Sequence, residues 1–196
     1  MSEQALSQLR EFANDYDIPI VEDEVLDVLR LLLRIRPPAR VLEIGTAIGY
    51  ASIAFSMCTD APVVTIEREE AMYYRALQNI RASGLEHRIE VLFGDARDLL
   101  PTLKESYDFV FLDAAKAQYA DLLHRILPLV PPGGIICCDD VLYHGMVEDR
   151  SLLDRRMITI VKRMKKFLEE IRTIEGFETT LIRAGDGLAV LRRENA

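Results

Sequence analysis

The sequence has no tryptophan, only three cysteines and three histidines, and no apolar run near the roughly 20 residues that span a bilayer. Cys58, Cys137 and Cys138 have neither an even number nor metal-ligand spacing, which argues against a disulfide framework and a zinc site. The adjacent pair lies in an apolar stretch, so we expect buried thiols in a reducing cytoplasm. The first residues also lack the basic and apolar regions of a signal peptide. We therefore expect a cytoplasmic protein without a membrane span.

Positive charge is scarce as well. The net charge of −8 argues against a protein that coats nucleic acid by bulk charge. One cationic cluster stands out, which comprises Arg155, Arg156, Lys162, Arg163, Lys165, Lys166 and Arg172. It has two interpretations, a contact surface for phosphates or the solvated face of a helix, and the charge pattern favours the second because Glu169 and Glu170 lie on the same stretch.

The apolar pattern predicts a single domain over 1–196, with an N-terminal helical cover over 1–36 and a core over 37–196. Helices are expected at 3–12 and 22–35, either packed on the core or covering the mouth of a site. In the core, strands and helices alternate. The expected strands are 40–45, 62–67, 89–93, 107–113 and 134–139, and the expected helices are 48–58, 69–82, 96–103 and 116–129.

Such alternation predicts a parallel sheet with helices on both faces. The pattern then changes, because a long helix at 151–173 leads to strands at 177–183 and 187–192, joined by a short turn. That hairpin adds antiparallel pairing to the sheet. The fold class is therefore α/β: a Rossmann-like, mostly parallel seven-stranded sheet with an antiparallel C-terminal hairpin, which is the class I methyltransferase variant.

The segment 40–50 reads as strand, glycine turn and helix. Glycines at such a turn allow close approach of a ligand, and the helix N-terminus offers free N–H donors. Gly45 and Gly49 flank Ala47, which stands where a dinucleotide fingerprint has its middle glycine, so NAD and FAD are disfavoured. Glu67 ends the next strand and suits the hydroxyls of a ribose. S-adenosylmethionine, which has a ribose and no pyrophosphate, fits this pattern; the alternative is an ordinary tight turn.

Acidic residues follow the remaining strands, at the edge of the sheet where ligands bind in this class. Asp95 either meets an adenine edge or caps the next helix, and the two readings are evenly balanced. Asp113, Asp139 and Asp140 would repel one another unless a cation lay between them. Oxygen ligands favour Mg²⁺, with Mn²⁺ and Ca²⁺ as alternatives.

Such an ion would lower the pKa of a hydroxyl that is to be methylated. Lys116, one helical turn after Asp113, is a candidate general base, although its spacing alone favours an exposed lysine. His144 follows the acidic pair and is a candidate for the substrate pocket, but we expect a structural role for it, as for His87 and His124.

Taken together, the motifs resemble those of the cation-dependent S-adenosylmethionine O-methyltransferases, the family of catechol and caffeoyl-CoA O-methyltransferases. The segments that carry the resemblance, in the family's order and spacing, are 41–50, 111–119, 134–140 and 185–189. The resemblance implies cofactor contacts from Glu43, Gly45, Thr46, Gly49, Tyr50, Glu67, Asp95, Ala96 and Asp113. It also implies metal ligation by Asp113, Asp139 and Asp140, with Lys116 as the base, and a homodimer.

Two positions depart from the family pattern. The family usually has Asn where this chain has Asp140, which adds negative charge, and Ser where this chain has Ala51, which removes a hydrogen bond to the cofactor unless Ser52 replaces it. Within the family, the motifs look most like the bacterial tRNA 5-hydroxyuridine O-methyltransferases, in which case the cationic cluster would contact tRNA. The alternatives are a small catechol-like or phenolic acceptor and a cofactor-binding protein without activity.

Overall fold

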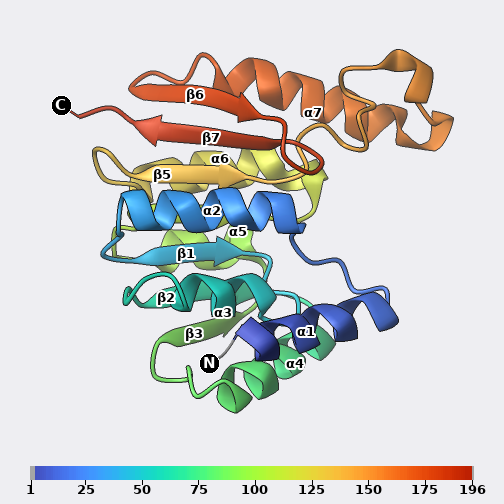
Figure 1. Cartoon of the computed structure of the whole chain (residues 1–196). Helices are drawn as coiled ribbons and strands as arrows, with labels where there is room; N and C mark the ends of the chain where they lie inside the picture. The colour runs from blue at the N-terminus through green and yellow to red at the C-terminus, as the bar shows by residue number, and fades with distance from the viewer. Residues whose placement is uncertain (1–2, 196) are drawn as a thin grey trace.

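Apolar strands build a seven-stranded sheet in the computed structural model, which describes residues 3–195. The strand order is β3-β2-β1-β4-β5-β7-β6, and β7 runs antiparallel to both of its neighbours (Figure 1). The strands are β1 (Val41–Ile44), β2 (Val63–Glu67), β3 (Ile89–Phe93), β4 (Phe109–Leu112), β5 (Ile135–Cys138), β6 (Phe177–Ile182) and β7 (Leu188–Arg193). The predicted fold class is thereby confirmed.

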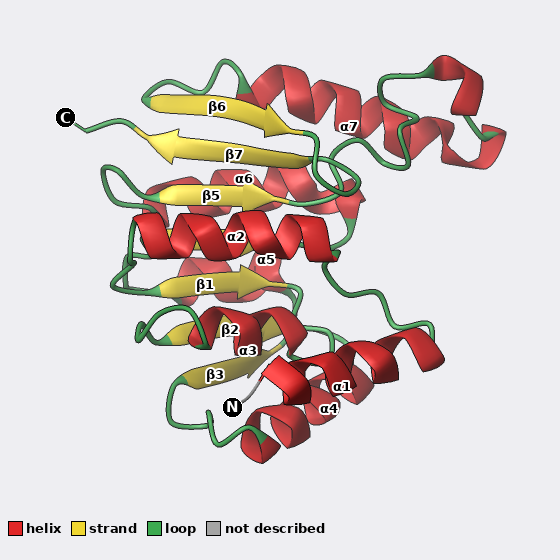
Figure 2. Ribbon diagram, viewed as in Figure 1, coloured by secondary structure: helices red, strands yellow, loops and turns green. Residues whose placement is uncertain are grey.

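Helices cover both faces of the sheet, as the alternating strands require (Figure 2). The α-helices are α1 (Glu3–Asp15), α2 (Asp23–Ile35), α3 (Tyr50–Ser56), α4 (Glu70–Ala82), α5 (Ala96–Leu99), α6 (Tyr119–Ile126) and α7 (Ile158–Ile171). Successive residues of one strand point to opposite faces of the sheet. Phe109 packs in the cluster that contains α1 to α4, and Val110 packs in the cluster that contains α5 to α7. No helix within residues 3–195 is long and apolar enough to cross a membrane.

The two N-terminal helices belong to the main core. In α2 the buried residues Val25, Leu26, Leu29 and Leu33 form one stripe, which confirms the predicted amphipathic helix. They pack in the same cluster as Phe55 of α3 and the central strands. The first of the two predicted interpretations, packing on the core, therefore holds for α2.

Several predicted helix boundaries are wrong. The helix expected at 151–173 begins only at Ile158, because residues 153 and 154 are extended. The side chains of Asp149 and Asp154 accept the N–H groups of Ser151 and Arg156, and these contacts form two isolated turns instead of one helix. The first helix, expected to end at residue 12, continues to Asp15. The 3₁₀ turns are η1 (Leu100–Thr102), η2 (Lys116–Gln118), η3 (Leu127–Leu129), η4 (Arg150–Leu152) and η5 (Arg155–Met157).

The loops after β1 to β5 meet at the carboxyl edge of the sheet, on the right in Figure 1. The helix that follows the first loop is held in place from the core side. Phe55 of α3 stands edge-on to Phe109 and Phe111 of β4, at centroid distances of 5.9 and 5.6 Å. Each such pair contributes about 0.5–1.5 kcal/mol beyond burial. The glycine turn therefore has a rigid helix behind it.

Candidate active site

The turn after β1 contains three residues with positive φ, Gly45, Ala47 and Gly49. A Cβ on Gly45 would lie 1.8 Å from the backbone oxygen of Asp113, so the end of β4 can pack here only against glycine. Ala47 adopts a left-handed conformation at φ 46°, and its N–H donates to Glu67 Oε2 at 2.8 Å. The turn is thus locked to the ends of two neighbouring strands.

Glu43 lies in β1 and is completely buried. Its Oε2 accepts hydrogen bonds from the hydroxyls of Ser52 and Thr65, whereas its Oε1 has no partner among residues 3–195. Burial raises the pKa of Glu43 to about 8. The side chain lines a small cavity of about 20 Å³, the Glu43 cavity. An unpaired buried carboxylate oxygen there suits a ligand that brings an ammonium group.

Three further predicted cofactor residues lie around this turn. Thr46 and Tyr50 line the Glu43 cavity. The Thr46 hydroxyl lies 2.6 Å from that of Thr65, so it belongs to the Glu43 network. Gly49 packs toward α4, where a Cβ would meet Ile80 at 3.5 Å. Ser52 is committed to Glu43, so its hydroxyl does not replace the missing serine at position 51.

Glu67 ends β2 beside a larger cavity of about 340 Å³, the main cavity. Its carboxylate accepts three backbone N–H groups, from Ala47, Arg68 and Glu69, at 2.8–2.9 Å. These bonds hold the side chain in one orientation and leave lone pairs for further donors. A fixed carboxylate of this kind suits a pair of vicinal hydroxyls.

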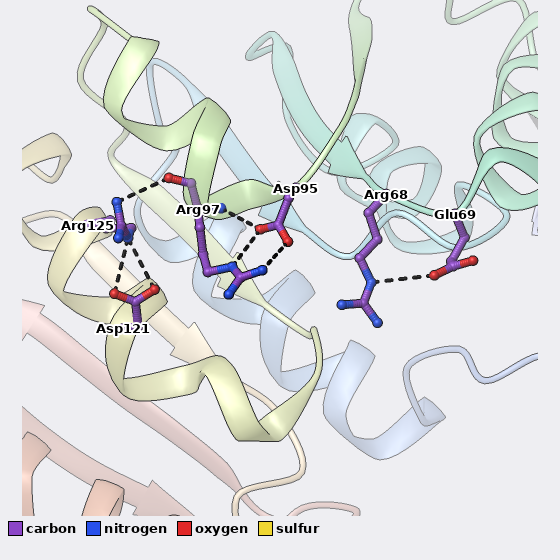
Figure 3. A network of polar contacts seen from close by, with 6 residues as sticks. All are labelled: Arg68, Glu69, Asp95, Arg97, Asp121 and Arg125. Atoms are coloured by element: carbon purple, nitrogen blue, oxygen red, sulfur yellow. Dashed lines mark hydrogen bonds and ion pairs between the residues drawn. The ribbon is translucent and has the colours of Figure 1, made fainter.

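Asp95 and Ala96 line the same main cavity. The Asp95 carboxylate accepts the Arg97 N–H at 2.9 Å, so the predicted helix cap is confirmed. The Arg97 guanidinium also makes two hydrogen bonds to it, at 3.0 and 2.7 Å (Figure 3), and these bonds lower the pKa of Asp95 to about 2. The network continues to Arg125, which donates to the Arg97 carbonyl and pairs with Asp121. Contact with adenine stays a prediction.

Asp113, Asp139 and Asp140 line a third cavity of about 190 Å³, the acidic cavity. Lys116 Nζ lies 2.9 Å from both Asp113 Oδ1 and Asp140 Oδ2, and donates to the Tyr119 hydroxyl at 2.9 Å. The cation expected between the carboxylates is therefore, in this structure, the ammonium of the chain's own lysine. Within residues 3–195, no three acidic, histidine or cysteine side chains form a ready-made metal site.

Lys116 is the residue whose environment differs most from expectation. Its side chain is only 10% exposed, so the reading as an exposed lysine is wrong. Burial alone disfavours the charged form, but contacts with Tyr119, Asp113 and Asp140 outweigh burial and raise the pKa of Lys116. As the structure stands, Lys116 is a cation.

The acidic residues nevertheless carry the oxygen donors that a divalent ion prefers, and Asp139 is the one of them with which Lys116 forms no ion pair. Its side chain accepts the Asp140 N–H at 2.8 Å, but no cationic group pairs with it among the described residues. Burial, together with the charges of Asp113 and Asp140, raises the pKa of Asp139 to about 8. Asp140 holds the left-handed φ of 52° that Asn and Asp tolerate. The oxygen-only donor set suits Mg²⁺, Mn²⁺ or Ca²⁺.

Residues 18–22, between α1 and α2, form a strap that contributes to the walls of all three cavities. Arg10 holds the strap in place. Its guanidinium donates to the Val21 carbonyl at 2.8 Å and to the Tyr50 hydroxyl at 3.1 Å, pairs with Asp23 at 2.8 Å, and stacks over the Tyr50 ring. The segment between the two N-terminal helices therefore forms part of the walls of the site, and its role as a cover stays a prediction.

Arg10 was not predicted, because one arginine in an amphipathic helix carries no motif. Asp186 was not singled out either, although it belongs to the segment 185–189. It lines the acidic cavity and accepts the N–H groups of His144 and Gly145. His144 lines this cavity too, with an exposed ring.

Known proteins share the family and the fold of this chain. A family profile described as O-methyltransferase matches residues 2–194. The flavonoid 3′,5′-methyltransferase of Vitis vinifera is 30% identical, over 84% of this chain and 74% of its own. A Staphylococcus aureus protein provisionally named a caffeoyl-CoA O-methyltransferase superposes with a TM-score of 0.91 at 35% identity, over 96% of this chain and 91% of its own. TomG of Streptomyces achromogenes, an O-methyltransferase solved with S-adenosylmethionine, superposes with a TM-score of 0.85 at 29% identity. The match covers 100% of this chain and 92% of TomG.

Proposed function

The chain belongs to the O-methyltransferase family and is an S-adenosylmethionine-dependent O-methyltransferase related to the caffeoyl-CoA enzymes, and we propose that it methylates 5-hydroxyuridine in tRNA to 5-methoxyuridine. The proposal includes a divalent cation, Mg²⁺ in the first place, and a cytoplasmic setting. The observation that carries it is the position of Asp113, which lines the main, acidic and Glu43 cavities together. Donor and acceptor would meet there.

The cofactor extends along the carboxyl edge of the sheet in this proposal. Its ammonium group would pair with the free oxygen of Glu43, and its ribose hydroxyls would bind Glu67. The adenine would lie beside Asp95 and Ala96 in the main cavity. All of these groups are fixed by backbone contacts or burial, so positioning supplies much of the rate enhancement.

The acceptor would enter the acidic cavity beneath the strap. Asp113, Asp139 and Asp140 would hold the divalent ion, which supplies a Lewis acid that lowers the pKa of the acceptor hydroxyl. Ligation by Asp113 and Asp140 would remove two of the contacts that favour the ammonium form of Lys116. Lys116 could then lose a proton to solvent and, as the neutral amine, would receive the proton of the acceptor hydroxyl. In 5-hydroxyuridine the hydroxyl stands beside the 4-carbonyl, so two adjacent oxygens face the ion, as in a catechol.

The cationic cluster supports tRNA as the acceptor. Its side chains are exposed except for the half-buried Lys165. Within residues 3–195 none of the seven cations forms an ion pair, whereas the exposed acids Glu3, Glu148 and Glu178 are each paired with an arginine. Unpaired cations on one surface of an acidic protein are suited to a phosphate backbone.

A homodimer is part of the proposal. Tyr74 and Leu77 of α4 and Phe93 of the edge strand β3 are 55%, 38% and 51% exposed, and the Tyr73 ring contacts the rings of both Tyr74 and Phe93. A second copy would cover these exposed apolar side chains. We expect Phe93→Asp to turn a dimer into a monomer in sedimentation equilibrium. A wild type that sediments as a monomer would remove this part of the proposal.

A small phenolic acceptor is the second candidate. Its support is the flavonoid methyltransferase among the relatives, whose name indicates a phenolic substrate. The same donor and metal arrangement would serve it, because a catechol also offers two adjacent oxygens to the ion.

The test is methyl transfer from labelled S-adenosylmethionine to tRNA that carries 5-hydroxyuridine and, separately, to catechol, with Mg²⁺ or with EDTA. We expect transfer to tRNA that EDTA abolishes and that Asp139→Asn reduces at least 100-fold. Asp98→Asn, which changes the same charge on exposed α5, is the matched control and should retain activity. Transfer to catechol alone would establish the second candidate, and transfer that resists EDTA would refute the metal site.

A further inference from the structure

A fourth cavity, of about 280 Å³, lies between α7 on one side and η2 with α6 on the other. Both helices cover the same face of the sheet, and in Figure 1 α6 lies behind β5 and β7 whereas α7 lies at the level of β6. Its inner wall is aromatic, since Tyr119 and Phe167 are buried and stand edge-on to each other at 5.5 Å. We call it the α6–α7 cavity. Neither the cofactor nor the acceptor hydroxyl of the proposed reaction occupies it.

The charges on its wall favour an anion. Arg163 and Lys166 of α7 line the cavity, are exposed, and form no ion pair with any described residue. The wall also contains Asp121 and Glu170, but both are already engaged, by Arg125 at 3.2 Å and by His124 at 2.6 Å. The charged side chains of the wall that have no partner among the described residues are therefore two cations, one of them a guanidinium that can bind two oxygens of a phosphate at once.

The cavity also adjoins the reaction centre. Lys116 lines both the α6–α7 cavity and the main cavity, and its Nζ lies 2.9 Å from Asp113 and from Asp140, which line the acidic cavity where the acceptor would enter. A group held by Arg163 and Lys166 can thus belong to the same molecule as the hydroxyl that faces Lys116. This relation distinguishes these two cations from Lys162 and Arg172, which are exposed on the same helical segment and do not line the cavity.

We infer that the α6–α7 cavity binds a phosphate group of the methyl acceptor. The inference rests on the proposed O-methyl transfer beside Lys116, and it holds whether the phosphate comes from an RNA nucleotide or from a phosphorylated small acceptor. Arg163 and Lys166 orient the acceptor through its phosphate, while the hydroxyl reacts beside Lys116. Phosphate-bearing acceptors are therefore preferred to the same acceptors without phosphate.

The first experiment compares matched acceptors by kcat/KM. The pairs are 5-hydroxyuridine with and without a 5′-phosphate, and caffeoyl-pantetheine with and without its 4′-phosphate, so that the two sources of phosphate are separated. For at least one pair we expect the wild type to prefer the phosphorylated member about tenfold or more. The double variant Arg163→Gln/Lys166→Gln should lose that preference, because its kcat/KM for the phosphorylated member falls to that for the unphosphorylated one.

The control is Lys162→Gln/Arg172→Gln, which removes the same two charges outside the cavity and should leave the preference intact. The inference is refuted if the wild type shows no preference in either pair, or if both double variants lose it equally, because bulk charge would then be the cause. Circular dichroism melting curves verify that each variant is folded.

A second measurement needs no methyl transfer. Inorganic phosphate is titrated into each protein at constant ionic strength, and binding is followed by ³¹P line broadening. We expect saturable broadening with the wild type and the control, and its loss in Arg163→Gln/Lys166→Gln. Saturable binding by a wild type that methylates none of the acceptors would refute the proposed function and leave the phosphate site standing. If the variant Arg163→Gln/Lys166→Gln still broadens the ³¹P line of phosphate in a saturable way, the site itself is refuted.

Discussion

The buried Glu43 makes the stability of this protein depend on pH in a way that a single substitution removes. An ordinary glutamate has a pKa of 4.5, whereas burial raises the pKa of Glu43 in the folded protein to about 8. Between these values the folded state binds a proton that the unfolded state has already released. The free energy of unfolding therefore falls as pH rises from about 4.5 to about 8. The gap corresponds to about 5 kcal/mol.

The perturbation is Glu43→Gln, which keeps an oxygen for the hydroxyls of Ser52 and Thr65 but cannot ionise. Urea unfolding of both proteins, without cofactor, is measured at half-unit steps from pH 5 to pH 9. Other titrating groups contribute to both curves, so the informative quantity is the difference in unfolding free energy between variant and wild type. We expect this difference to grow in favour of the variant by several kcal/mol, up to about 5, across this range.

A difference that stays constant with pH would refute the reasoning, because Glu43 would then be ionised in the folded state at every pH measured. Calorimetric titration with S-adenosylhomocysteine at pH 7 supplies a check from the ligand side. If the ligand's ammonium group pairs with Glu43 Oε1, binding ionises the carboxyl and releases a proton. The heat should then differ between phosphate and Tris buffers for the wild type, and that difference should shrink in Glu43→Gln.

Two further predictions concern the strap and the glycine turn. Arg10→Ala should raise the KM of both substrates about tenfold while kcat changes less, because the strap loses its tie to Tyr50. Steady-state kinetics with each substrate varied in turn measures both constants. A fall in kcat alone would contradict this prediction. Gly45→Ala should lower the free energy of unfolding in urea by about 3 kcal/mol or more, since its Cβ would collide with the Asp113 carbonyl. Gly84→Ala, where a Cβ meets nothing within 4 Å, should lower it by about 1 kcal/mol. Equal losses would show that the positive φ alone determines the effect.

Strand positions were predictable because apolar runs bounded by turns leave few alternatives. The predicted strand 89–93 agrees with β3, and the other strands differ by one or two residues at an end. Helix starts were harder, as 151–173 shows. Whether Asp154 continues a helix or caps a new turn depends on the hydrogen bond from the Arg156 N–H to its side chain. The periodicity of apolar residues contains no information about that hydrogen bond.

The candidate site was also predictable only in part. The sequence alone placed Glu67, Asp95, Asp113 and the pair 139–140 at the carboxyl edge, because each lies at the end of a predicted strand or just after it. It did not reveal that the Glu67 carboxylate is fixed by three backbone N–H groups. Nor did it distinguish the two readings of Asp95, since a cap and a ligand contact use the same residue type at the same position.

What the sequence determined by itself is the order of elements, the class of fold and the residues that the sheet brings to one edge, since all three depend on local patterns. Tertiary structure alone decided which charges meet. Lys116 is a buried cation between two aspartates, and Arg10 ties a distant strap to Tyr50, because chain segments remote in sequence converge there. Ionisation depends on burial and on neighbours within a few ångströms, and these are properties of the packed molecule.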